Sequence, residues 1–157
     1  MEPPKYQRKW EELNRALERL KKFYQNYVQD GHDSFQGPKD FANNFFRISY
    51  ELKEAIKKID NISSTLPNTV EQFASSNPWV GLSLDITNQE KHISLNRSRT
   101  SKQIGTITSH VHIFDLNGKD RTELKIEIAR KKEDCLEVAE QIVKAWKTFL
   151  IDRSLIS

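Results

Sequence analysis

Residues 38–59 read PKDFANNFFRISYELKEAIKKI, and this stretch decides the fold. Its apolar residues recur at alternating steps of four and three, which is the spacing of one face of an α-helix. The residues of this stripe are Phe41, Phe45, Ile48, Leu52, Ala55 and Ile59. Phe46, Tyr50 and Ile56 widen the stripe, and a stripe that broad is covered on more than one side. We therefore predict that this stretch forms the most buried helix of the protein.

The preceding segment, 6–29, carries a heptad seam of apolar residues. The seam contains Trp10, Leu13, Leu17, Leu20 and Tyr24. Charged residues of both signs lie between these positions, as is typical of a solvated helix face. The pattern fits either a helix of the protein's own bundle or a helix that pairs with a second chain, and both alternatives stay open. In the second case the seam itself is the interface.

Two further helices are expected downstream. Asn68 or Thr69 can cap a short one. Asn77, followed by proline, fits an N-cap with proline at the first helical position, and it opens a helix that ends around His92. Together these helices extend the helical core over 38–95.

Beyond this helix the hydrophobic period changes to two. Residues 104–116 and 123–128 alternate as strands do, and Asn117-Gly118 between them is a strong turn signal. The sequence therefore predicts a β-hairpin over 104–128 with one solvated face.

The register of this hairpin stays open. A two-residue loop pairs Val111 with Leu124, whereas a four-residue loop pairs Val111 with Ile126. Both alternatives keep the apolar residues on one side of the hairpin.

A last helix is predicted over 132–151, where apolar residues return to helical spacing. They are Cys135, Val138, Ala139, Ile142, Trp146, Phe149 and Leu150. This helix must pack back on the bundle. The three tryptophans, Trp10, Trp79 and Trp146, lie on apolar stripes and are predicted as core residues.

Length and composition bound the class of protein. The 157 residues fit one domain, and an aromatic content of 10% argues against disorder. One cysteine cannot form an intramolecular disulfide and fits a reducing compartment. With no signal peptide and no apolar run near about 18 residues, we expect a cytoplasmic protein without membrane contact. The net charge of +3 permits contact with nucleic acid without requiring it.

These elements predict a single domain over 1–157 of the α+β class, mainly α. The expected architecture is a helical bundle of about four long helices and one short helix, with a β-hairpin inserted before the C-terminal helix.

The sharpest polar feature is a cluster on the helix that follows Asn77. Asp85, Asn88 and His92 recur at i, i+3 and i+7, so they share one helix face. The negative end of a helix favours imidazolium, and His92 could therefore titrate near neutral pH as a general acid or base does. In the alternative interpretation, Asp85 and Asn88 satisfy backbone groups and His92 caps the helix. The cluster has no nucleophile, so its chemistry would be acid–base catalysis on a phosphodiester.

Basic residues surround this cluster. Arg97, Arg99 and Lys102 follow His92 closely, and Lys91 lies beside it on the helix. They are the candidate phosphate-binding residues for an RNA ligand, although such a run is equally typical of solvated surface.

His110 and His112 lie on one predicted strand face and, with His92, could supply three zinc ligands. No cysteine or suitably placed carboxylate completes such a site. We predict no metal and no other cofactor.

Two segments carry a resemblance to known proteins. Residues 45–56, FFRISYELKEAI, and 85–92, DITNQEKH, resemble a family of short bacterial proteins with the motifs FFxxxxxLK and DxxNxxKH. The closing helix of that family is matched here by Trp146, Phe149 and Leu150. The resemblance spans about Asp40 to Leu150.

More remotely, the arrangement resembles the HEPN superfamily of helical bundles, many of which are dimeric RNA-cutting toxins or defence components. The resemblance implies that Asn88 and His92 occupy the polar and histidine positions of that family. HEPN nucleases also carry an arginine, then four to six residues, then the histidine, and no arginine of this chain stands at that distance before any histidine.

Two functions follow from these patterns. The first is a binding module of a bacterial defence or toxin–antitoxin-like system that associates with itself or with a protein partner. The second is a metal-independent endoribonuclease in which His92 is the general acid or base and Asn88 and Asp85 orient it. We rank the binding module first, because the missing arginine removes the usual charge partner of the transition state.

Overall fold

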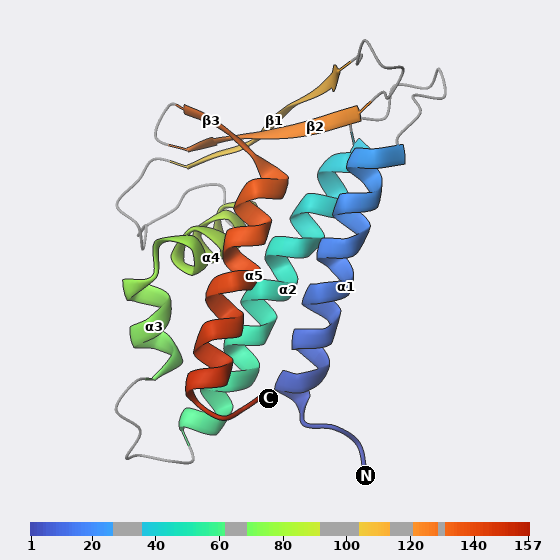
Figure 1. Ribbon diagram of the computed structural model, residues 1–157. Coiled ribbons are helices and arrows are strands. Elements are labelled where there is room, and N and C mark those ends of the chain that lie inside the picture. Colours follow the sequence, from blue (N-terminus) through green and yellow to red (C-terminus); the bar gives the residue numbers. More distant parts are fainter. Residues whose placement is uncertain (27–35, 62–68, 92–103, 114–120, 129–130) are drawn as a thin grey trace.

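We describe the protein from a computed structural model (Figure 1). The structure describes residues 1–26, 36–61, 69–91, 104–113, 121–128 and 131–157. Five helices and three strands are formed within these ranges. The helices are α1 (Lys5–Asn26), α2 (Gln36–Asp60), α3 (Val70–Ser76), α4 (Pro78–Lys91) and α5 (Cys135–Asp152). The strands are β1 (Ile104–Ile113), β2 (Arg121–Ile128) and β3 (Lys131–Asp134).

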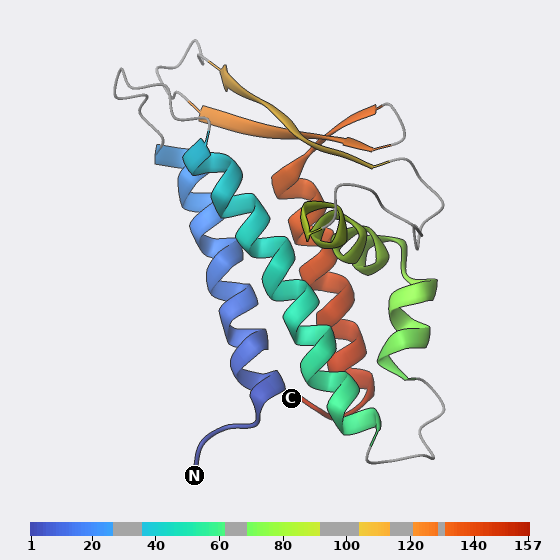
Figure 2. The ribbon, with the colours of Figure 1, turned by 180° about the vertical axis from the view of Figure 1, so that it is seen from behind.

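The long helices α1, α2 and α5 run side by side, and the sheet lies across one end of them (Figures 1 and 2). α4 packs against α2 and α5, and the short α3 packs against α2 and α4. Both chain ends lie at the end of the bundle away from the sheet. The predicted class is confirmed: an α+β fold, mainly α, with a β-hairpin before the last helix. In the part of the chain that the structure describes, no helix is both long enough and apolar enough to cross a membrane.

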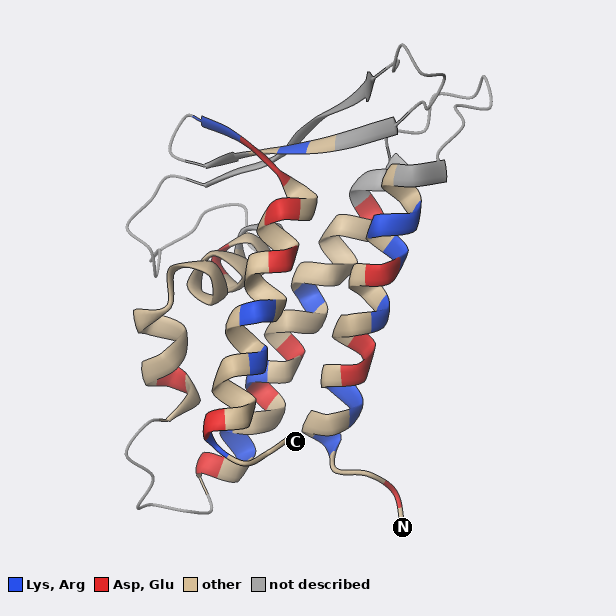
Figure 3. Ribbon diagram, viewed as in Figure 1, with Lys and Arg blue, Asp and Glu red and all other residues tan. Residues whose placement is uncertain are grey.

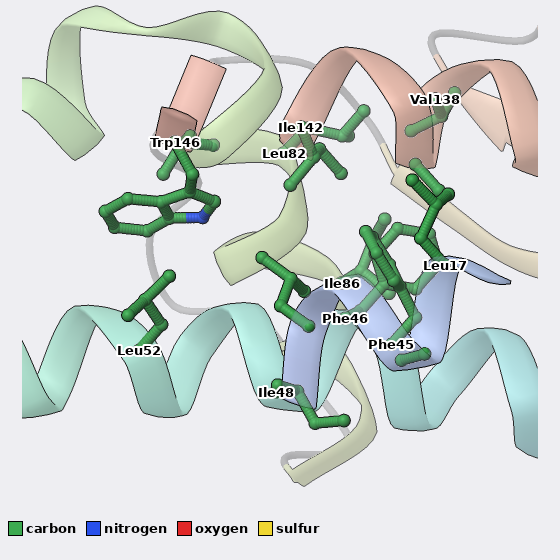
Figure 4. Close-up of a cluster of buried hydrophobic side chains, with 14 of the residues drawn as sticks. Leu17, Phe45, Phe46, Ile48, Leu52, Leu82, Ile86, Val138, Ile142 and Trp146 are labelled. Atoms are coloured by element: carbon green, nitrogen blue, oxygen red, sulfur yellow. The ribbon is translucent and has the colours of Figure 1, made fainter. Parts of the chain in front are cut away.

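The helix α2 lies at the centre of the core, as its broad stripe predicts. It packs against α1, α3, α4 and α5, and Phe45, Phe46 and Ile56 are buried. Figure 4 shows side chains of several helices meeting in this core. Phe41 is an exception, because it is exposed and its ring centroid lies 6.2 Å from that of Phe23 on α1. The stripe therefore extends beyond the core at this end of the helix.

The heptad seam of α1 packs within the chain. Leu13, Leu17, Leu20 and Tyr24 are buried in the protein's own core, and Trp10 packs against it. The helix contacts α2, α5 and β2. Of the two alternatives that the sequence left open, the structure therefore has the bundle helix. The seam is not available as an interface between chains in this arrangement, because it faces the interior.

Two predicted helix caps are confirmed. Thr69 Oγ1 accepts a hydrogen bond from the N–H of Gln72, and the Gln72 side chain accepts one from the N–H of Thr69. Asn77 Oδ1 accepts hydrogen bonds from the N–H groups of Trp79 and Val80, at 3.1 Å each. The second cap fixes where α4 begins, and with it the position of Trp79 in the first turn.

The hairpin is confirmed, but both of its predicted registers are wrong. β1 and β2 pair antiparallel, and Val111 lies opposite Glu123 rather than opposite Leu124 or Ile126. The register shifts twice along β1, as β-bulges cause. Alternation of apolar residues cannot show an extra residue in one strand, so the sequence did not reveal the shift. The turn at Asn117-Gly118 lies outside the described residues.

The last helix begins later than predicted, because Lys131–Asp134 form the strand β3. This strand pairs antiparallel with β2 and completes a three-stranded sheet. Asp134 Oδ2 then accepts a hydrogen bond from the N–H of Glu137 at 3.1 Å, which starts α5. Charged residues fit the end of a strand as well as the first turn of a helix, so the sequence placed this boundary too early.

Candidate functional site

The acid–amide–histidine cluster lies partly in the interior. Asp85 and Asn88 are both on α4, as predicted, but Asp85 is 0% exposed and Asn88 is half-buried. His92 lies outside the described residues. Because Asp85 is enclosed by the protein, its carboxylate does not face a substrate from bulk solvent.

The basic residues proposed to hold phosphate are not placed by the structure. Lys91 ends α4, but its side chain lies outside the described part of the chain. The following residues lie outside it altogether: Arg97, Arg99 and Lys102. His110 and His112 lie on β1, again without described side chains. Among the side chains that are described, no three of the His, Cys, Asp or Glu type come together to hold a metal ion.

The segment 45–56, which carries one of the two motifs, serves the interior of the bundle. Its two phenylalanines are core residues. Lys53 is also buried, and its Nζ lies 2.8 Å from Glu54 Oε1 and 2.8 Å from Glu71 Oε1. Since Glu71 belongs to α3, this lysine ties α3 to α2. The motif therefore has a structural explanation.

A chain of hydrogen bonds joins α2, α4 and α5 inside the core. Trp146 Nε1 donates to Ser49 Oγ at 2.9 Å, Ser49 Oγ lies 2.9 Å from Ser83 Oγ, and Ser83 Oγ donates to the carbonyl oxygen of Val80 at 2.8 Å. Because Ser83 gives its one hydroxyl proton to Val80, Ser49 is the donor between the two serines. Every donor in this series of hydrogen bonds is used. These groups therefore hold the bundle together and have no donor left for a ligand.

An open pocket lies where α4, α5 and β3 meet. It has a volume of about 310 Å³ and is lined by Trp79, Glu133, Glu137, Val138, Glu140 and Gln141. Trp79 is 37% exposed, whereas Val138 is buried and forms an apolar part of the lining. Trp79 was predicted as a core residue, and this prediction is wrong: its apolar stripe continues into the core at Leu82 and Ile86, but Trp79 itself is exposed, although the next residue, Val80, is buried.

The lining of this pocket is negative in character. Three of the side chains are glutamates, and the face of an indole ring also attracts cations. One basic group contacts this lining, since Lys21 Nζ lies 3.9 Å from Glu140 Oε1. The three carboxylates do not group into a metal site. We conclude that the pocket suits an organic cation whose apolar part can lie against Trp79 and Val138.

A buried tyrosine supports the corner that carries two of these glutamates. Tyr24 Oη lies 2.9 Å from Asp134 Oδ1 and 3.1 Å from the carbonyl oxygen of Leu124, and it shares its proton between them. It accepts hydrogen bonds from the N–H groups of Leu124 and Leu136. Burial raises the pKa of Tyr24 far above its ordinary value, so the hydroxyl stays protonated. The tyrosine thereby fixes β3 and the start of α5 relative to α1.

The start of α5 offers no reactive thiol. Cys135 is buried. Burial is the main cause that raises the pKa of its thiol, and the neighbouring Asp134 carboxylate raises it further. The thiol therefore stays neutral and behaves as a small apolar core residue.

The sequence carries one signal for the pocket. Glu137 and Glu140 lie three residues apart, a spacing that places both carboxylates on one side of a helix. What the sequence could not show is that β3 turns into α5 beside the exposed Trp79.

Comparison of the chain with models of known protein families, with curated proteins and with solved structures finds no match. The resemblance to the short bacterial family and to the HEPN superfamily therefore stays a prediction. The function has to be argued from the pocket and the core.

Proposed function

We propose that this protein is a binding module that holds a basic side chain of a protein partner in the pocket beside Trp79. The observation that supports this most strongly is the lining itself: an exposed indole and three glutamates around an open hollow. Large apolar side chains exposed among charged ones are typical of binding surfaces. As the sequence suggests, we place this module in the bacterial cytoplasm.

The chemistry of the lining favours a lysine or arginine side chain. The methylene groups of such a side chain can pack on Trp79 and Val138, while its charged end reaches the carboxylates. A cation over a tryptophan ring contributes about 0.5 to 2 kcal/mol, depending on how far it is desolvated. RNA is disfavoured at this place, because phosphate oxygens would be repelled by the glutamates.

A titration with charged peptides tests the proposal. We expect a heptalysine peptide to bind, and a heptaglutamate peptide not to bind, in isothermal titration calorimetry at low ionic strength with dilute protein. W79A should weaken heptalysine binding about tenfold, because it removes the ring and leaves the carboxylates. E137Q/E140Q should weaken it at least as much.

The matched control is E2Q/E11Q, which neutralises two exposed glutamates outside the pocket, whose ion-pair partners Arg8 and Arg15 do not line it. It should leave heptalysine affinity nearly unchanged. If the control variant loses as much affinity as E137Q/E140Q, the peptide binds through overall charge and the proposal fails.

The ribonuclease hypothesis is tested in a separate assay, which measures cleavage of RNA. Its carboxylate, Asp85, is enclosed, and its histidine lies outside the described residues. Incubation of wild type and H92A with a pool of cellular RNA distinguishes the two functions. RNA cleavage by wild type that is lost in H92A would overturn the binding module as the main function.

A further inference from the structure

The outward face of α5 carries a charge pattern that is complementary to itself. Glu137, Glu140, Lys144 and Lys147 follow one another at steps of three, four and three. At about 100° per residue they fall within an arc of about 80° of the helix surface. All four are exposed, and Figure 3 shows acidic segments of α5 nearer the sheet and basic segments beyond them. The buried residues of α5 occupy the opposite side of the helix.

A two-fold rotation that reverses the direction of α5 about its midpoint exchanges the acidic pair of residues with the basic pair. Residue 142 lies halfway between Glu137 and Lys147, and it also lies halfway between Glu140 and Lys144. Two copies of α5 that lie antiparallel across a two-fold axis therefore bring each acidic pair opposite a basic pair. An interface of this kind is isologous, because the same patch of both copies meets itself.

We propose that the basic partner of the Trp79 pocket is a second copy of this chain, docked antiparallel along α5. In this dimer Lys144 and Lys147 of one copy face Glu140 and Glu137 of the other. The inference rests on the proposed function, since it names the source of the basic side chains that the pocket holds.

The exposed apolar residues near α5 fit the same symmetry. Ile151 is 44% exposed and lies on the charged face, near the C-terminal end of the helix. The two-fold operation that pairs residues 137 and 147 places Ile151 about one helical turn beyond residue 137 of the other copy, at the N-terminal end of its α5, where Glu133 and Trp79 line the pocket. Each copy thus brings an exposed isoleucine to the other's exposed tryptophan, and the dimer covers both apolar side chains.

The charges of this face are largely free for such a contact. Among the described residues, neither Lys144 nor Lys147 has an ion-pair partner. Glu140 contacts Lys21 at 3.9 Å, yet 49% of its side chain remains exposed. Glu137 uses its backbone N–H in the cap of α5, which leaves its carboxylate at the pocket.

Charge reversal with sedimentation equilibrium tests the dimer. Wild type should dimerise at micromolar concentration. E137K/E140K makes the face wholly basic and K144E/K147E makes it wholly acidic, so each variant alone should be monomeric. An equimolar mixture of the two should form a heterodimer, and the fourfold variant E137K/E140K/K144E/K147E should dimerise again because the complementarity is restored.

These outcomes separate the dimer from general charge effects. The control E2K/E11K makes the same change of charge away from α5 and should leave the dimerisation constant within about twofold of wild type. Circular dichroism of every variant confirms that the helices are intact. Monomeric wild type up to high micromolar concentration, or dimers that persist in both double reversals, would overturn the inference.

Failure of the dimer and failure of the binding module can be distinguished. If wild type is a monomer and still binds heptalysine in a manner that requires Trp79, the pocket has a different partner and only the dimer is wrong. If heptalysine binding does not depend on Trp79, the proposed function is wrong as well.

Discussion

Two tryptophans of this protein occupy contrasting surroundings. Trp146 of α5 is 0% exposed and lies among apolar side chains of the core (Figure 4). Its N–H donates a hydrogen bond to Ser49 Oγ. Trp79 of α4 is 37% exposed and lines a pocket with glutamates. Both residues lie on apolar stripes in the sequence. The same residue type thus completes the core at one place and lines an open pocket at another.

The difference comes from what surrounds each ring. Trp146 packs against Phe73 and Phe149, with ring centroids 5.3 Å and 5.9 Å away. Its one polar group is satisfied by a serine. Trp79 sits in the first turn of its helix, where the residue remains 37% exposed and glutamates line the pocket beside it. A ring in the first setting stabilises the fold through burial, whereas a ring in the second keeps part of its surface exposed.

Truncation of the two rings should give the largest contrast in stability. W146A removes a fully buried ring and leaves a cavity, so the free energy of unfolding should fall by about 3 to 5 kcal/mol. W79A removes a partly exposed ring and should cost about 1 kcal/mol or less. Urea denaturation followed by circular dichroism measures both. Equal losses would show that the two regions do not differ as described.

The tryptophans also show how far the sequence predicts this protein. Spacing of three and four identified α2, α4 and α5 and placed Trp146 in the core, because periodicity reports which face of a helix is apolar. It placed Trp79 there too, since periodicity does not tell where along a helix the core ends. The exposure of Trp79 depends on the position of β3 and α5, which are distant in the sequence.

The polar residues were harder to predict than the apolar ones. Asp85 was predicted as a member of a polar cluster on one helix face, and it is buried, because α4 packs against α2, α3, α5 and β1. The contacts of Ser49 with Ser83 and Trp146 join residues 34 and 97 positions apart. No local sequence pattern shows that a serine will take part in a buried series of hydrogen bonds. Long-range packing decides it.

The pocket beside Trp79 depends on the buried Tyr24, which holds the point where β3 leads into α5. Y24F removes the hydroxyl that serves Leu124, Asp134 and Leu136, and it leaves buried N–H groups without an acceptor. We expect the free energy of unfolding to fall by about 2 to 3 kcal/mol. Heptalysine affinity should fall as well, because the strand that carries Glu133 is held by this contact. A variant with full stability and full affinity would show that the corner is held by other contacts.

Loss of the buried hydrogen bonds around Trp146 and Ser49 should have a smaller effect on stability. S49A leaves Trp146 Nε1 without an acceptor, whereas Ser83 keeps its bond to Val80. The expected loss is about 1 to 2 kcal/mol in urea denaturation. T148A is a suitable control, because Thr148 is exposed and bonds only within its own helix. If S49A and T148A cost the same, the buried chain contributes little beyond packing.

The smallest effect concerns pH and distinguishes the neutral core from the charged surface. Burial alone would raise the pKa of Glu51, but the hydrogen bond and charge of Lys9, assisted by Arg47, outweigh it and lower the pKa below its ordinary value of 4.5. A lowered carboxyl pKa stabilises the fold above the ordinary value, and this contribution is lost as the pH falls through the lowered one. The pair is partly exposed and joins α1 to α2, so we expect about 0.2 to 1 kcal/mol.

The change E51Q should therefore reduce stability at pH 7 and leave stability nearly unchanged at a pH below the lowered pKa. S49A should lower stability equally at both pH values, because neither the serines nor Trp146 titrate in this range. Urea denaturation of both variants and wild type at the two pH values provides the test. An E51Q effect that persists in acid would mean that Glu51 acts through packing rather than charge. An S49A effect that changes with pH would mean that the buried hydrogen bonds of Ser49 are coupled to a titrating group.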